Sequence, residues 1–124
     1  MPVRGIRGAI TVSENTEHAI LAATRELLDG LVENNPGLQS DAIASAWFTV
    51  TADLDAVYPA KAARQQGWQL VPLLCTQEIP VPGGLPMCVR VLIHWNTERS
   101  QAEINHVYLG DAVVLRPDLS NKQL

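Results

Sequence analysis

The sequence has little of what several protein classes depend on. Only two of its 124 residues are cysteines, Cys75 and Cys88. They form no CxxC pair and no four-ligand set, which argues against a structural zinc site and a disulfide framework. No apolar run approaches the ~20 residues that a membrane span needs. Arg4 and Arg7 lie where a signal peptide would be hydrophobic. We therefore expect a cytoplasmic protein in a reducing compartment.

Positive charge and familiar catalytic motifs are also scarce. Nine Lys and Arg stand against thirteen Asp and Glu, a net charge of −4, whereas nucleic-acid-binding domains usually carry a basic excess. There is no GxSxG motif, and Gly83-Gly84 lacks the Lys and Ser/Thr of a phosphate loop. His18, His94 and His106 are scattered, without metal-ligand spacing. We expect no nucleic acid, no metal and no cofactor.

The length and the 47% apolar content predict one domain, residues 1–124, with a substantial core. Hydrophobic periodicity and turn signals predict the order β-α-β-α-β-β-β, an α+β domain with a single mixed sheet. The predicted strands span 2–12, 43–51, 68–75, 88–95 and 107–115, and the predicted helices run from Ser13 or Thr16 to Asn34 and from Pro59 to Gln66. Residues 116–124 are expected to form a mobile polar tail.

The segment 88–95 bears on assembly, because it is apolar on both faces except for Arg90 and His94. Such a strand should be covered on both sides. One long and one short helix cover only part of one side of a five-stranded sheet. We therefore expect copies of the chain to cover the other face in a closed homo-oligomer, with a site between subunits.

Arginines on predicted strands are the candidate functional residues. Arg90 has apolar neighbours on both sides, and a cation buried there must be paired or bound to a ligand, because burying it alone is costly. An internal ion pair with Glu78 or Asp111 is one alternative, and an anionic ligand is the other. Arg7, between two glycines, has the same two alternatives.

Other cations join these two. Arg116 has the same ambiguity as Arg90, and strand alternation predicts that it shares a face with Tyr108. Lys61 and Arg64 share a helical face, which could equally be an ordinary solvated surface. In an acidic protein the pattern favours a focused positive pocket for a small, multiply anionic ligand. Glu78 would be the one carboxylate directed at a polar group of that ligand.

Five blocks of the sequence carry a family resemblance. They are RGIRGA at 4–9, AVYPAKAAR at 56–64, GWQLVPLLCTQE at 67–78, GGLPMCVRV at 83–91 and HVYLGDAVVLRPDL at 106–119. In this order they resemble the small chorismate mutases that form a homotrimeric pseudo-α/β-barrel, a class distinct from the all-helical one. The resemblance covers nearly the whole chain. It implies a monofunctional enzyme that rearranges chorismate to prephenate, with active sites in clefts between subunits.

The resemblance also implies site residues. The family's catalytic positions fall on Arg7, Cys75, Glu78, Arg90 and Tyr108. Further substrate-binding positions line the cleft or its mouth, and they fall on Tyr58, Ala60, Lys61, Arg64, Leu73, Leu74, Leu115 and Arg116. Two residues depart from the expected pattern: Tyr58 stands where Phe is expected, and Leu74 replaces a polar residue, so a contact there would run through its backbone.

The absence of familiar catalytic motifs agrees with the implied reaction, because a pericyclic rearrangement needs no nucleophile, base, metal or cofactor. We assign Arg90 to the ether oxygen, where negative charge grows as the bond stretches. Arg7 and Tyr108 would bind a carboxylate of the substrate. Glu78, together with Cys75, would accept the hydrogen bond of the hydroxyl group on the substrate ring. Lys61, Arg64 and Arg116 would capture and retain the dianion. Arg4, in the first of the five blocks, is a further candidate for the same anion site.

Two other functions are compatible with these residues. The first is a trimeric imine or enamine deaminase, which also uses an interfacial arginine but needs a water for hydrolysis. The second is a non-catalytic trimeric binding module, in which the arginines would pair internally. The pair Glu78 and Arg90, together with Tyr108 and the tail at Arg116, favours the mutase.

Overall fold

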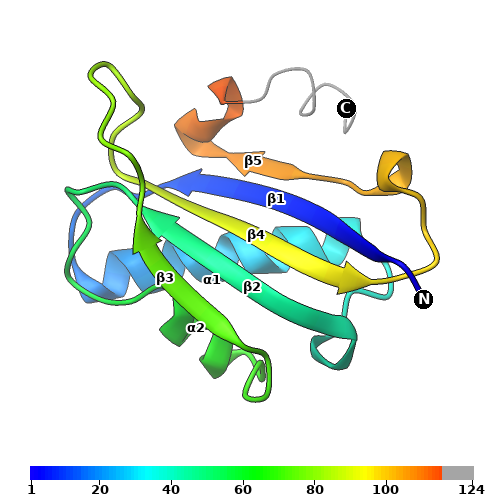
Figure 1. Ribbon diagram of the computed structural model, residues 1–124. Helices are drawn as coiled ribbons and strands as arrows, with labels where there is room; N and C mark the ends of the chain where they lie inside the picture. The colour runs from blue at the N-terminus through cyan, green and yellow to red at the C-terminus, as the bar shows by residue number, and fades with distance from the viewer. Residues whose placement is uncertain (116–124) are drawn as a thin grey trace.

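A single mixed sheet organises the structure, a computed structural model that describes residues 1–115. Its order is β3-β2-β4-β1-β5 (Figure 1). The strands are β1 (Val3–Thr11), β2 (Ile43–Val50), β3 (Leu73–Gln77), β4 (Cys88–Asn96) and β5 (Val107–Leu109). β4 pairs antiparallel with β1 and β2, whereas β3 and β5 add parallel strands at the two edges. The α+β class and the predicted order of elements are confirmed. The predicted tail, with Arg116, lies outside the described residues.

Both helices, α1 (Glu17–Asn34) and α2 (Ala60–Gln65), cover the same face of the sheet (Figure 1). Thr16 caps α1, because its hydroxyl accepts the N–H of Ala19 at 3.1 Å. The apolar stripe of α1 is buried against β1, where Gly8 allows close approach: a Cβ there would lie 3.0 Å from Leu31 and 3.1 Å from Leu27. Sequence periodicity and this glycine together fix how α1 lies on the sheet.

The opposite face of the sheet has no helix across its centre (Figure 1). Three large apolar side chains on it are partly exposed: Trp47 by 46%, Leu74 by 57% and Leu92 by 39%. They are neighbours across three strands, because Trp47 pairs with both Leu74 and Leu92. We call this surface the open face. A single chain thus leaves uncovered the side for which the sequence predicted cover by other copies.

Three short 3₁₀ helices complete the described chain: η1 (Ser40–Ala42), η2 (Gln101–Glu103) and η3 (Gly110–Val114). A capping box is present at the start of η2, since Ser100 and Glu103 bond reciprocally. The hydrogen bond from the Ser100 N–H holds the pKa of Glu103 below its usual value. η3 packs over one end of the open face, where Ala112 joins a small buried cluster. No helix among residues 1–115 is long and apolar enough to cross a membrane.

Two predicted strand boundaries are wrong. The strand predicted at 68–75 is β3, Leu73–Gln77, because Trp68 is buried as the end of a turn, its N–H donating to Ala63 O at 3.1 Å. The strand predicted at 107–115 stops at Leu109.

The early end of β5 has a local cause. Gly110 has a positive φ of 60° and the chain turns there into η3. Thr11 Oγ1 accepts the N–H of Asp111 at 3.1 Å and lies 2.5 Å from where a Cβ on Gly110 would be, so only glycine fits. The strand alternation that placed Tyr108 and Arg116 on one face therefore does not apply.

Candidate active site

Arg90 lies at the centre of the sheet, in β4, opposite Ala9 of β1 and Thr49 of β2. Its Nε is 3.5 Å from Oε2 of Glu78, and Thr49 Oγ1 donates to the same carboxylate oxygen at 3.1 Å. Of the two candidate carboxylates, Glu78 is therefore the one that pairs with Arg90, and Asp111 is exposed in η3 instead. The two charged side chains are 24% and 29% exposed, so both are accessible to a ligand.

Arg7 shares the open face with Arg90, because it pairs with Leu92 in the same antiparallel ladder. Its backbone N–H donates to Nδ1 of His106 at 2.9 Å, which fixes this part of β1 against the segment before β5. Arg7, Glu78 and Arg90 together line a cavity of about 180 Å³. A second cavity of about 270 Å³ shares Glu78 and Arg90 with the first and lies under the loop 79–86. We call these two adjoining cavities the charged pocket.

Tyr108 and Leu115 lie beside the charged pocket. Tyr108 pairs with Ala9, the ladder neighbour of Arg90, and it is buried in a small cluster with Cys88 and Ala112. Leu115 packs against the same cluster. Neither residue is among those that line the two cavities of the charged pocket.

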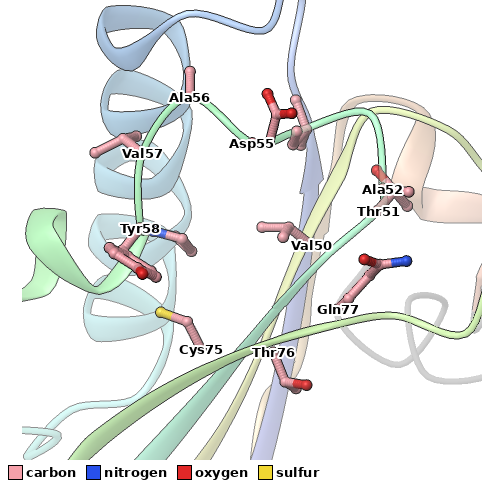
Figure 2. Close-up of a pocket in the computed structure, with 12 residues that line it drawn as sticks. Val50, Thr51, Ala52, Asp55, Ala56, Val57, Tyr58, Cys75, Thr76 and Gln77 are labelled. Atoms are coloured by element: carbon pink, nitrogen blue, oxygen red, sulfur yellow. The ribbon is translucent and has the colours of Figure 1, made fainter.

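A larger cavity of about 550 Å³, the edge pocket, lies at the sheet edge formed by β3. Tyr58 and Cys75 line it, together with the end of β2 and residues of the loop that follows, and Figure 2 shows the two side chains on neighbouring walls. Burial raises the pKa of the Cys75 thiol, although the Ala60 backbone and the Arg64 charge oppose the shift. The thiol is therefore neutral at physiological pH and is a weak donor, not a nucleophile.

The remaining predicted residues lie on α2 and β3, outside the lining of the edge pocket. Ala60 is buried at the start of α2, and Arg64 is exposed near the pocket. Lys61 Nζ pairs with Oε2 of Glu17 at 3.1 Å, and both side chains are largely solvated. On β3, Leu73 packs against the main core and Leu74 lies on the open face.

One suggested cation does not belong to this group. Arg4 lies on the opposite side of β1 from Arg7, since successive strand residues point to opposite faces and the two differ by an odd number of positions. Its Nε donates to the carbonyl of Arg99 at 2.8 Å. Including Arg4 in the anion site is therefore wrong.

The predicted site is thus divided within one chain. Arg7, Glu78 and Arg90 meet in the charged pocket, whereas Tyr58 and Cys75 meet in the edge pocket. Cys75 lies in β3 and Glu78 directly follows this strand, where its N–H still pairs with Val50 O. The two side chains point to opposite faces of the sheet, because they are an odd number of residues apart. None of the cavities described above contains residues of both sets.

Sequence reasoning missed some polar partners. Thr49 was predicted only as part of a strand, yet it donates to Glu78, and strand alternation from Trp47 would have placed it on the open face. Ser45 and His94, for which no partner was evident, contact each other with Oγ 3.0 Å from Nδ1. This pairing depends on the register of β2 against β4, including the irregularity between Ile43 and Ser45, so no local signal predicts it.

Cysteine and metal-ligand groups add no further site. Both Cys75 and Cys88 are free thiols. Across residues 1–115 the structure contains no group of three or more His, Cys, Asp or Glu side chains arranged to hold a metal ion. The charged pocket itself presents two arginines together with carboxylate and threonine hydroxyl groups.

Comparison with known proteins gives consistent matches. The family described as chorismate mutase type I matches residues 3–119. The chain is 57% identical over 122 residues to chorismate mutase AroH of Thermus thermophilus, covering 98% of this chain and 99% of that protein. It is 49% identical over 121 residues to chorismate mutase AroH of Bacillus subtilis, covering 97% and 94%. A solved chorismate mutase from Clostridium thermocellum superposes with a TM-score of 0.86 at 52% identity, covering 89% of this chain and 97% of that one.

Proposed function

The chain belongs to the chorismate mutase type I family, and from this premise we propose that its charged pocket, completed by the edge pocket of a neighbouring copy, is where the substrate reacts. The chain is a chorismate mutase, an isomerase that converts chorismate to prephenate on the way to phenylalanine and tyrosine. The observation that carries the assignment of the site is the convergence of Arg7, Glu78 and Arg90 on one cavity.

The reaction itself determines what the site must supply. A Claisen rearrangement breaks the ether C–O bond and forms a C–C bond within one molecule, with no proton transferred. The protein must hold the substrate in a compact conformer and stabilise the charge that develops on the ether oxygen. Fixed cationic donors act more strongly on that charge in the transition state than in the ground state.

Arg90 is suited to the ether oxygen. It is held in the middle strand of the sheet, between two ladder partners, and its guanidinium is partly buried. A guanidinium has five N–H donors, so the contact of Nε with Glu78 uses only part of its capacity. The donors that are left can meet a ligand without moving the strand.

Arg7 and Glu78 are suited to the two ends of the substrate. Arg7 lines the same cavity as Arg90 and provides a second cation for a carboxylate, with Tyr108 close by. Glu78 accepts from Thr49 and faces Arg90, and a carboxylate has further acceptor sites for a ring hydroxyl. Two cations and one acceptor match a dianion that carries one hydroxyl group.

We also propose that the functional unit is a homotrimer. Trp47, Leu74 and Leu92 form an apolar surface on the open face, which a second copy would cover. The division of the predicted residues between two pockets is explained if each active site takes its charged pocket from one subunit and its edge pocket from the next. Arg64 would then reach the ligand from the neighbouring subunit.

The span of the domain and the cellular location are also proposed. One domain is proposed to span residues 1–124, since the family match runs over 3–119. A cytoplasmic location is proposed because the two cysteines are free thiols, as expected in a reducing compartment.

An assay of chorismate consumption tests the reaction. Wild-type protein should deplete the diene absorbance of chorismate, with a rate that is nearly flat from about pH 6 to 8.5 because no proton is transferred. A hydrolytic deaminase with a titrating base would instead give a sloping or peaked profile.

Mixing of subunits then tests the shared site. Arg90→Gln impairs the charged pocket, and the double substitution Tyr58→Ala, Arg64→Ala impairs the edge pocket. If sites are shared, denaturing and refolding the two variants together should restore roughly a quarter of the sites, since each mixed trimer holds one intact site. Activity equal to the mean of the separate variants would contradict the shared site.

A further inference from the structure

The loop between β2 and α2 carries a polar network that lies outside the residues assigned so far. Asp53 accepts the backbone N–H of Met87 with both carboxylate oxygens, at 3.2 and 3.0 Å. Thr51 donates its hydroxyl to the same carboxylate and accepts the N–H of Cys88 at 3.0 Å. The Thr51 N–H also donates to the Cys88 carbonyl at 3.1 Å. Two side chains of this loop therefore hold the first residue of β4 and the residue before it.

Met87 needs such an anchor because of its backbone conformation. Its φ is +53°, and it is the one non-glycine residue with a positive φ among residues 1–115. Any residue with a Cβ disfavours a positive φ, and such a backbone conformation persists only where the surroundings impose it. Here the N–H is fixed by Asp53 and the carbonyl accepts the Val12 N–H at 2.7 Å. Both sides of the residue are thus fixed by groups distant in sequence.

The anchored turn leads directly into the charged pocket. It ends the loop 79–86 and starts β4, in which Arg90 follows Met87 by three residues. Asp53 and Arg90 line the same cavity of about 270 Å³, with Glu78 between the loop and the sheet. The direction in which the chain leaves Met87 therefore sets both the loop wall of the pocket and the entry of the strand that holds its central cation.

We propose that Asp53 is a positioning residue for the rearrangement, which acts through the left-handed backbone of Met87 to hold Arg90 and the loop 79–86 in place. Its carboxylate is taken up by the Met87 N–H and the Thr51 hydroxyl, so in this role it acts through the backbone and not on the reacting atoms. The inference rests on the proposed function of the charged pocket, since its kinetic consequence arises through Arg90. Its structural consequence, the anchoring of Met87 and Cys88, can be measured without any assay of catalysis.

The test compares kcat and KM of Asp53→Ala, Asp53→Asn and the double variant Asp53→Ala, Met87→Gly. Asp53→Ala should lower kcat about 10- to 100-fold, because small misplacement of a catalytic group has effects of that size, and should change KM less. Asp53→Asn keeps one oxygen acceptor for the Met87 N–H and should lose less. Adding Met87→Gly should restore most of the loss, because glycine adopts the positive φ without the anchor. Met87→Gly alone gives the baseline for the double variant.

Asp41→Asn is the matched control, since Asp41 is an exposed carboxylate in η1 and its loss changes the net charge equally. Amide hydrogen exchange supplies the second measurement: Asp53→Ala should speed exchange at Met87 and Cys88, and Asp41→Asn should not. Unchanged kcat in Asp53→Ala, a loss that Met87→Gly does not reduce, or unchanged exchange at both amides would each overturn the proposal. An inactive wild-type protein would instead refute the function, and the exchange result would still decide the anchoring.

Discussion

The charged pocket and the edge pocket are formed on one small sheet but are built differently. In the charged pocket, Arg7 and Arg90 lie on strands with a partner on each side, and Glu78 is held by Thr49 and by the N–H that it donates to Val50 O at 2.8 Å. In the edge pocket, Tyr58 lies on a loop and is 72% exposed, and Cys75 lies on an edge strand.

This difference separates two tasks. A group that must face a developing charge has to be fixed before the reaction, because reorganisation during the reaction costs the stabilisation it provides. A group that captures or encloses the substrate contributes binding that is similar in ground and transition states. The central strands therefore suit electrostatic catalysis, and the loop beside α2 suits capture. Substitutions at four positions test this comparison.

The largest effect is expected in the charged pocket. Arg90→Gln should lower kcat at least about 10²- to 10³-fold, the usual cost of losing one preorganised donor. Arg90→Lys should remain well below wild type, because an ammonium group lacks the planar fork. Steady-state kinetics with chorismate measures both, and thermal unfolding controls for folding. Unchanged turnover in Arg90→Gln would remove the assignment of Arg90 to the ether oxygen.

A different pattern is expected from the cation beside the edge pocket. Arg64→Ala should raise KM about three- to tenfold and lower kcat less, because an exposed charge contributes modest binding that does not depend on the reaction step. The KM of the wild type should also rise more with added salt than that of the variant. A large loss of kcat with normal KM would instead place Arg64 among the fixed catalytic groups.

Tyr58→Phe should have a smaller effect. The substitution keeps the ring that lines the edge pocket and removes a hydroxyl on a largely exposed side chain. We expect kcat/KM to change by no more than about threefold, within the value of one hydrogen bond. Tyr58→Ala is the informative comparison, and equal losses in the two variants would show that the hydroxyl, not the ring, is needed.

The smallest effect concerns the pH dependence of stability. Burial raises the pKa of Cys75 above 9.0, so the folded state holds that proton more tightly than the unfolded state. Its contribution to stability is complete well below the ordinary pKa of a thiol and is lost as the pH rises from there through the raised pKa. When the pH rises from about 7 to 10, the Tm of Cys75→Ser should therefore fall less than the Tm of the wild type. Parallel curves for the two proteins would contradict the buried thiol.

Some features of the fold were predictable because their causes are local. The stripe of α1 and the cap at Thr16 lie within one segment, so the helix was found with nearly its true bounds. The end of β5 was not predictable in this way, since it depends on the contact of Gly110 with Thr11, a residue far away in the sequence. The start of β3 was misplaced because Trp68 looks like a strand residue although it is anchored in a turn.

The sequence by itself determined the order of elements, the family and the identity of the charged residues, because periodicity, capping and residue matches are properties of the chain. The scarcity of cysteine and of catalytic motifs was informative for the same reason. Only the tertiary structure decided which partner Arg90 takes, that Lys61 pairs with Glu17, and that Arg4 faces away from Arg7. It also revealed the anchor between Asp53 and Met87. Such contacts depend on strand register and on long-range approach, and no spacing within the sequence encodes them.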